Sequence, residues 1–183
     1  MSIKIIDLEI IHKDLIDQIA NILVDCFKQY SPSWVPDQST AKQKVLNSLV
    51  DGYRSRVLVD HNQTVLGWAG GIAHKNVWEI HPIAVSKREQ RKGYGRLLVE
   101  DVSAIAKANG AVAVWAGTGD ETGATSFAKT DLYKNTASAL VNFQVPENHP
   151  VNFWLRVGFT LVGVLPDEEG LGKPGIHFSR RLV

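Results

Sequence analysis

The sequence is poor in cysteine, with Cys26 as the one thiol among 183 residues. A single cysteine cannot form a disulfide within the chain, which excludes the disulfide framework of a small secreted domain. Cys26 lies among apolar residues at helical spacing, and we interpret it as a small buried hydrophobe. The N-terminal stretch MSIKIIDLEI lacks the pattern of a signal peptide, so we expect a reducing, cytoplasmic environment.

Neither positive nor negative charge dominates the sequence, which contains 20 Lys and Arg residues and 19 Asp and Glu residues. Such a balance lacks the polybasic character typical of proteins that bind nucleic acid or an anionic membrane. No stretch approaches the about 18 consecutive apolar residues that span a bilayer. We therefore expect one globular domain over residues 1–183, with neither nucleic acid nor membrane as a partner.

The apolar periodicity that is present predicts an α/β fold in the order β-α-α-β-β-β-α-β-α-β-β on a mixed sheet. Pro82 interrupts one strand, and because proline cannot donate to a sheet ladder we expect a bulge or a local split there. Residues 117–135 are polar and predict a surface loop. The predicted strands are residues 3–10, 55–60, 64–74, 77–85, 111–118, 159–166 and 175–183, and the predicted helices are residues 14–30, 40–50, 93–109 and 147–158.

A basic, glycine-bearing turn joins the strand that contains Pro82 to the following helix. Backbone N–H groups in such a turn point into one concavity, and the helix N-terminus adds a partial positive charge. Neither a Walker loop nor a complete dinucleotide fingerprint is present. The pattern predicts a phosphate or pyrophosphate site, and its alternative is a solvated basic helix cap. The candidate residues are Arg91, Lys92, Gly93, Tyr94, Gly95 and Arg96.

The spacing Gln90-x-x-Gly93-x-Gly95 resembles the signature Q/R-x-x-G-x-G/A of the GCN5-related N-acetyltransferases (GNAT). The blocks WEIHPIAV, GTGDETGATSFAKTDLY and HPVNFWLRVGF are similar, in the same order, to those of the aminoglycoside 6'-N-acetyltransferases. This resemblance implies a mixed, mostly antiparallel sheet, split between its fourth and fifth strands and flanked by about four helices. It also implies direct transfer of acetyl from acetyl-CoA to a primary amine of a small molecule, without an acyl-enzyme and without a metal.

The same resemblance assigns roles along the interrupted strand. The backbone of Ile83, Ala84 and Val85 would hold the pantetheine arm of acetyl-CoA, ahead of the pyrophosphate turn. Glu79 matches the position usually proposed for the general base. His81 faces the same way on a regular strand and is either a second proton acceptor or a satisfied polar residue.

One position departs from the family pattern. A tyrosine five residues before the Phe of the Gly-Phe pair commonly protonates the departing thiolate, and this position is Trp154 here. An indole N–H is not an acid of that kind. We expect water, Tyr94 or Tyr133 to supply the proton, and Trp154 to pack on the pantetheine wall.

The acceptor would need a polar, partly aromatic pocket. A polycationic aminoglycoside calls for several carboxylates, yet the loop is less acidic than expected, with Gly119 and Thr122 where aspartates would strengthen the case. The alternatives are a peptide or protein N-acetyltransferase, and a non-catalytic acyl-CoA sensor that lacks the tyrosine. The group is often dimeric, and the apolar C-terminal strands suit a homodimer. The predicted substrate-binding residues are Phe27, Trp34, Asp120, Glu121 and Glu147.

Overall fold

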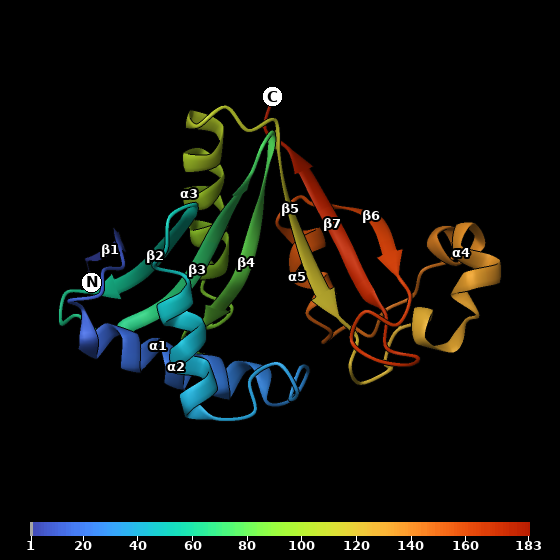
Figure 1. The fold of residues 1–183 in the computed structure, drawn as a ribbon, viewed down its shortest axis with the longest axis horizontal. Helices are drawn as coiled ribbons and strands as arrows, with labels where there is room; N and C mark the ends of the chain where they lie inside the picture. The colour runs from blue at the N-terminus through green and yellow to red at the C-terminus, as the bar shows by residue number, and fades with distance from the viewer. Residues whose placement is uncertain (1) are drawn as a thin grey trace. The chain divides into compact units, whose positions relative to one another are not determined.

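The computed structural model describes residues 2–183, which form two compact units. The first unit contains the chain up to Val114 together with Arg181–Val183, and the second contains Trp115–Arg180. The elements of the first unit, labelled in Figure 1, are β1 (Ile3–Asp7), α1 (Lys13–Phe27), α2 (Gln38–Asn47), β2 (Tyr53–Asp60), β3 (Val65–His74), β4 (Val77–Val85) and α3 (Tyr94–Ala108). Those that lie in the second unit or enter it are β5 (Ala113–Gly119), α4 (Leu132–Val141), α5 (Val151–Arg156), β6 (Thr160–Leu165) and β7 (Gly175–Arg181).

The first unit is built on four antiparallel strands in the order β1-β2-β3-β4. Helix α1 places Leu15, Ile19 and Leu23 at a spacing of four residues, and all three are buried. These side chains share a core with α2 and with Trp68 of β3. A Cβ atom at Gly71 would lie 2.8 Å from a methyl group of Val102 in α3, so α3 covers the other face of the same strands.

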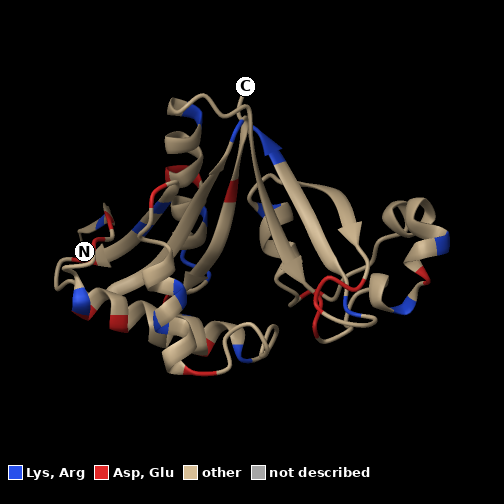
Figure 2. Cartoon of the chain, viewed as in Figure 1, with Lys and Arg blue, Asp and Glu red and all other residues tan. Residues whose placement is uncertain are grey.

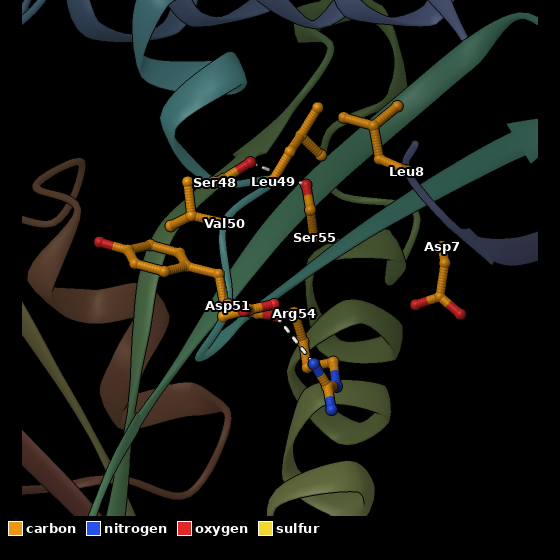
Figure 3. Close-up of a pocket in the computed structure, with 9 residues that line it drawn as sticks. Asp7, Leu8, Ser48, Leu49, Val50, Asp51, Arg54 and Ser55 are labelled. Carbon is orange, nitrogen blue, oxygen red and sulfur yellow. Dashed lines mark hydrogen bonds between the residues drawn. The ribbon is translucent and has the colours of Figure 1, made fainter. Parts of the chain in front are cut away.

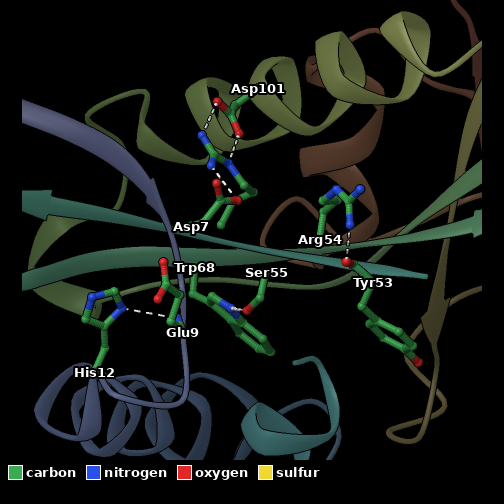
Figure 4. Close-up of polar contacts among 9 residues, drawn as sticks. Asp7, Glu9, His12, Tyr53, Arg54, Ser55, Trp68 and Asp101 are labelled. Atoms are coloured by element: carbon green, nitrogen blue, oxygen red, sulfur yellow. Dashed lines mark hydrogen bonds and ion pairs between the residues drawn. The ribbon is translucent and has the colours of Figure 1, made fainter. Parts of the chain in front are cut away.

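Arg56 ties three elements of this unit together. Its guanidinium lies 2.7 Å from Asp7 Oδ1 of β1 and 2.7 Å from Asp101 Oδ2 of α3 (Figure 4). The hydrogen bond to Asp101 raises the pKa of Arg56, although burial opposes the rise. The ion pair therefore connects the edge strand β1 to the helix on that face of the sheet.

The predicted interruption at Pro82 is confirmed as a bulge in β4. Ala69 of β3 is paired with Ile83, whereas Gly71 is paired with Ile80, so His81 and Pro82 together face Gly70. A Cβ atom on Gly70 would lie 2.2 Å from the carbonyl oxygen of His81, and only glycine fits there. The bulge shifts the pairing register with β3, while buried and partly exposed residues still alternate along β4.

The second unit contains β5, β7 and β6 in that order, and β6 pairs antiparallel with β7. Residues 132–141 form helix α4, whereas the sequence analysis predicted a polar loop up to residue 135 and assigned no element directly after it. Its backbone departs from helical angles at Asn135, and only Leu132 and Ala139 are buried, so its sequence carries no clear helical period. Five α-helices are thus found in residues 2–183 rather than about four, and the predicted order of the other elements is confirmed.

No helix within residues 2–183 combines the length and the apolar content needed to cross a bilayer.

Candidate active site

Two imidazoles flank a carboxylate on the β3–β4 hairpin. Glu79 Oε2 lies 3.4 Å from His74 Nε2, and Glu79 Oε1 lies 3.9 Å from His81 Nδ1. The side chain of Glu79 is 17% exposed, against 50% for His74, so the carboxylate is the inner member of the three. Such a group can hold and pass a proton.

Strand register explains this arrangement. Glu79 is paired with Ile72 across the hairpin, and His74 is paired with Val77, so His74 is a diagonal neighbour of Glu79 on the same face. Glu79 and His81 are two residues apart and share that face, as predicted.

An aromatic pair borders His81. Trp34, from the loop between α1 and α2, makes an edge contact with the His81 ring at a centroid distance of 5.3 Å. Phe27, at the end of α1, lies 4.6 Å from Trp34, and Lys44 Nζ lies 4.3 Å above the Trp34 ring. The structure therefore brings four predicted site residues together: Phe27, Trp34, Glu79 and His81.

Burial and two charged neighbours determine the pKa of His81. Burial lowers the pKa of His81, the Glu79 carboxylate raises it, and the Lys44 ammonium lowers it again, with a net decrease. Burial also lowers the pKa of Lys44. A His81 whose pKa lies below the usual value is neutral near pH 7 and can accept a proton.

The predicted anion turn precedes α3 and has an unusual backbone. Arg91 and Gly93 both adopt positive φ, at 65° and 87°, and Gly93 is the residue before the helix. Leu97 makes the first helical hydrogen bond to Gly93, so the N–H groups of residues 94–96 have no carbonyl partner four residues back in the helix. This geometry suits a phosphate oxygen at the helix N-terminus. Lys92 forms an ion pair with Glu89 at 3.0 Å.

The end of β4 is braced by two side chains. The carbonyl oxygen of Val85 accepts hydrogen bonds from the Gln90 amide at 3.1 Å and from the Cys26 thiol at 3.2 Å. Burial raises the pKa of Cys26 to about 11, so the thiol keeps its proton. Cys26 is therefore a partly buried hydrogen-bond donor as well as an apolar residue. The remaining predicted cofactor residues of this strand, Ile83 and Ala84, precede Val85 in β4.

In the second unit, Trp154 of α5 is 4% exposed. Its indole N–H donates to Thr118 Oγ1 at 2.9 Å, and its ring contacts Phe159 at 5.0 Å. Tyr133 donates its hydroxyl to Asp167 Oδ2 at 3.0 Å. The packing of Trp154 on a pantetheine wall stays a prediction.

Asp120 is fully buried, and its carboxylate organises the loop after β5. The backbone N–H groups of Ala124 and Thr125 donate to it at 2.9 and 2.8 Å. His149 accepts from Val151 N at Nδ1, so its Nε2 carries the proton and faces Asp120 Oδ1 at 3.7 Å. This geometry favours anchoring of the loop over the predicted contact with substrate.

The other predicted carboxylates of this unit differ in their surroundings. Glu121 is 8% exposed. Its negative charge also acts on a neighbouring carboxyl group, that of Glu169. Burial raises the pKa of Glu169, and the charges of Glu121 and Glu168 raise it further. Glu168 and Glu169 belong to the acidic turn between β6 and β7 (Figure 2). Glu147 is exposed, and its carbonyl oxygen accepts from Asn152.

Sequence reasoning missed His74, Lys44 and the bracing role of Gln90. His74 ends its strand, and only the short hairpin turn at Lys75 and Asn76 places it beside Glu79. The turn could have been recognised from the two consecutive strands. The contact of Lys44 with Trp34 depends on how α2 packs, which no local pattern indicates.

A separate pocket of about 450 Å³ lies near the start of β2 (Figure 3). In its wall, the hydroxyls of Ser48 and Ser55 are hydrogen-bonded at 2.9 Å. Ser55 Oγ also accepts from the Trp68 indole N–H at 2.8 Å (Figure 4). None of the predicted site residues lines it. Within residues 2–183 no group of three or more His, Cys, Asp or Glu side chains is arranged to hold a metal ion.

An α/β fold with a basic, glycine-bearing turn ahead of a helix defines the class of protein to compare. Residues 16–134 match the model of the acetyltransferase (GNAT) family. The match spans more than half of the chain, so the chain belongs to the acetyltransferase (GNAT) family. No curated protein is similar enough to the chain to count as a match.

Solved structures support the fold. An aminoglycoside 6'-N-acetyltransferase complexed with coenzyme A is 24% identical, with a TM-score of 0.84 over 98% of this chain and 97% of that one. The aminoglycoside 6'-N-acetyltransferase from Enterococcus faecium gives 24% identity and 0.83 over the same shares. The ribosomal-protein-S18-alanine N-acetyltransferase from Escherichia coli is 15% identical, with a TM-score of 0.62 over 99% of this chain and 94% of that one. The predicted GNAT-type α/β fold is thereby confirmed.

Proposed function

We propose that this protein is an acetyl-CoA-dependent N-acetyltransferase that transfers acetyl directly to a primary amine of a small molecule. The observation that carries the proposal is the pairing of His81 with Glu79 on β4, the strand that leads into the anion turn. Family membership supplies the reaction class. One of the structurally similar proteins was solved with coenzyme A.

The turn fits the pyrophosphate of acetyl-CoA. Backbone N–H groups at the start of α3 would bind its oxygens, and Arg91, Lys92 and Arg96 would add charge. The backbone of Ile83, Ala84 and Val85 would position the pantetheine arm. Bound acetyl-CoA supplies the acetyl group as an activated thioester.

The attacking amine must be neutral, so a base must remove its proton. In our proposal His81 takes this task in place of Glu79, the residue that the resemblance to the family suggests, because burial and Lys44 keep the pKa of His81 below the usual value. Glu79 holds a negative charge beside the imidazole and stabilises the imidazolium that forms. A backbone N–H among residues 83–85 would stabilise the charge that develops on the carbonyl oxygen.

The departing thiolate needs a different proton source from the family's tyrosine. The indole N–H of Trp154 is already donated to Thr118, and the Tyr133 hydroxyl is donated to Asp167. We assign the proton to water, since a thiolate is a tolerable leaving group near neutral pH.

The acceptor is proposed as an amine that stacks on Trp34 and Phe27, beside Glu79. Aminoglycosides are the first candidates because two similar structures carry that activity in their names. Peptide amines form the second class, on the evidence of the alanine N-acetyltransferase with the same fold. A non-catalytic acyl-CoA sensor is the third, and it rests on Trp154.

The test is mass spectrometry of acetylated products with acetyl-CoA and a panel of aminoglycosides, polyamines, amino acids and short peptides. Detecting the product avoids reagents that would also modify the thiol of Cys26. Transfer to aminoglycosides supports the proposal, and transfer to peptides alone supports the second class. Coenzyme A binding by calorimetry without transfer to any amine supports the sensor. The proposed homodimer is tested by light scattering, where a monomer mass at micromolar concentration contradicts it.

A further inference from the structure

Lys44 is a partly buried ammonium on the acceptor side of the proposed site. Its Nζ lies 4.3 Å above the Trp34 ring, and no carboxylate of residues 2–183 lies within ion-pair distance of it. Burial lowers the pKa of Lys44, and within the same residues no negative charge raises it. The other lysine of α2, Lys42, forms an ion pair with Asp17 at 2.5 Å. Lys44 is therefore the lysine of this helix that retains an uncompensated charge.

Trp34 is the common neighbour of this ammonium and of the proposed base. The His81 ring meets the Trp34 ring at its edge, and Lys44 Nζ lies above the same Trp34 ring. Glu79 brings a negative charge to the His81 imidazole, at 3.9 Å from Nδ1. All of these side chains belong to the first unit of the chain. An acceptor that stacks on Trp34 therefore has both a negative group and a positive group within reach.

We propose that Lys44 binds a carboxylate of the acceptor, and that the substrate is a short molecule with both a primary amine and a carboxylate, as in an amino acid. The amine approaches Glu79 and His81, and the carboxylate accepts a charge-assisted hydrogen bond from the Lys44 ammonium. Lys44 then determines specificity by direct contact with the substrate. This acceptor class rests on the proposed function, because it concerns the same site.

The bound carboxylate supplies the negative charge that Lys44 lacks. Burying a charge is costly unless the charge is paired, so a carboxylate beside the ammonium offsets part of that cost. A polycation has the opposite effect, because it brings further positive charges toward Lys44 and like charges repel. Amino acids are therefore expected to be better acceptors than the aminoglycosides that the similar solved structures suggest.

Lys44 also has a structural contribution that the experiment must separate from binding. It lies in the last turn of α2, where a cation stabilises the carboxyl end of the helix. Its contact with the Trp34 ring adds a cation–π interaction. Both contributions are the same for every acceptor, whereas recognition of a carboxylate affects only the acceptors that carry one.

The experiment compares an amino acid with its amide, which has the same skeleton and amine but no carboxylate. The pair is phenylalanine and phenylalaninamide, whose rings can stack on Trp34, and mass spectrometry measures the acetylated products at one pH. The quantity compared is the ratio of kcat/KM for the acid to kcat/KM for the amide, in which an effect on the base His81 cancels. We expect Lys44→Gln to lower this ratio about tenfold.

Two further variants control for the loss of charge. Lys44→Arg should keep most of the wild-type ratio, because a guanidinium also binds a carboxylate. Lys42→Gln removes the same charge from α2 at a residue that is paired with Asp17, and it should leave the ratio unchanged. Transfer to phenylalaninamide by each variant shows that the variant is folded.

The failure of this inference differs from that of the proposed function. A wild-type enzyme that acetylates no amine would overturn both. Transfer by the wild type to aminoglycosides but not to amino acids would overturn carboxylate recognition alone. The same conclusion would follow from an unchanged ratio in Lys44→Gln, or from an equal loss with both acceptors, which indicates a structural role. A fall of the same size in Lys42→Gln would assign the effect to the general charge of α2 and would also overturn it.

Discussion

At the scale of single residues, the ionisation of His81 decides whether the proposed chemistry can run. Two neighbours act on it with opposite signs, because the Glu79 carboxylate favours the charged imidazole and the Lys44 ammonium disfavours it. Burial adds to the effect of Lys44 and lowers the pKa below the usual histidine value. The enzyme should therefore keep its base neutral further into the acid range than free imidazole would allow.

The first prediction concerns the acid limb of the pH profile. Lys44→Gln removes a positive charge, so the pKa of His81 rises and the limb of kcat moves to higher pH. Glu79→Gln removes a negative charge, so the limb moves to lower pH while kcat falls. The measurement is kcat from pH 5 to pH 9 for both variants. Shifts in the same direction would show that His81 is not the titrating base.

The second prediction concerns stability and Asp120. Burial raises the pKa of Asp120, but His149 and the N–H groups of Thr125 and Ala124 outweigh burial and hold it well below the usual range. Asp120→Asn keeps one acceptor oxygen but turns an NH2 group toward the second backbone donor, and we expect a loss of about 2 kcal/mol in the free energy of unfolding at pH 7.

The sign of the pH dependence follows from the depressed pKa. The Asp120 contribution is complete above the unfolded pKa of about 3.9 and disappears as pH falls through the folded pKa. The difference between wild type and Asp120→Asn should therefore shrink below about pH 4. Urea unfolding at pH 7 and in that acid range measures it, and a difference that is constant with pH would contradict the assignment. Full acetyl transfer by this variant would remove Asp120 from substrate binding.

At the scale of elements, the β4 bulge positions the base. His81 and Pro82 occupy the space opposite Gly70, and the His81 ring makes an edge contact with Trp34. The third prediction is that Gly70→Ala destabilises the protein by about 1–3 kcal/mol and lowers kcat, since its Cβ would meet a backbone oxygen at 2.2 Å.

The matched control for Gly70→Ala is Gly163→Ala in β6. Gly163 is also a strand glycine, but nothing lies within 4 Å of the position that its Cβ would take. Thermal unfolding and kcat of both variants separate a steric effect at the bulge from a general effect of alanine. Equal behaviour of the two variants would show that the bulge tolerates the extra atom.

The elements that could be predicted are those with strong local signals. Pro82 predicted the irregularity in β4, and Gly93 and Gly110 bounded α3, where both adopt positive φ. Helix α4 gave no such signal because it is kinked at Asn135 and mostly exposed. In the site, the pairing of Glu79 with His81 followed from strand alternation, whereas the contact of Trp34 with His81 depends on tertiary packing.

At the scale of the whole molecule, the chain forms two compact units, while its length and composition predict one domain. Two strands cross the boundary between the units along the chain. β5 begins at Ala113 in the first unit and continues into the second, and β7 ends at Arg181, back in the first. Neither strand can lose its structure in one unit without loosening its continuation in the other. We therefore infer that residues 1–183 act as a single cooperative domain.

The fourth prediction follows from these shared strands. Native-state hydrogen exchange should give the same opening free energy for the buried β2 residues Val57–Val59 and for the buried β7 residues Ile176 and Phe178. The measurement is exchange at increasing urea concentration, where a common global opening also requires a common urea dependence. The exposed helix α4 should open at lower cost and serves as the internal control. If β7 opened with a lower free energy and a smaller urea dependence than β2, the two units would unfold separately.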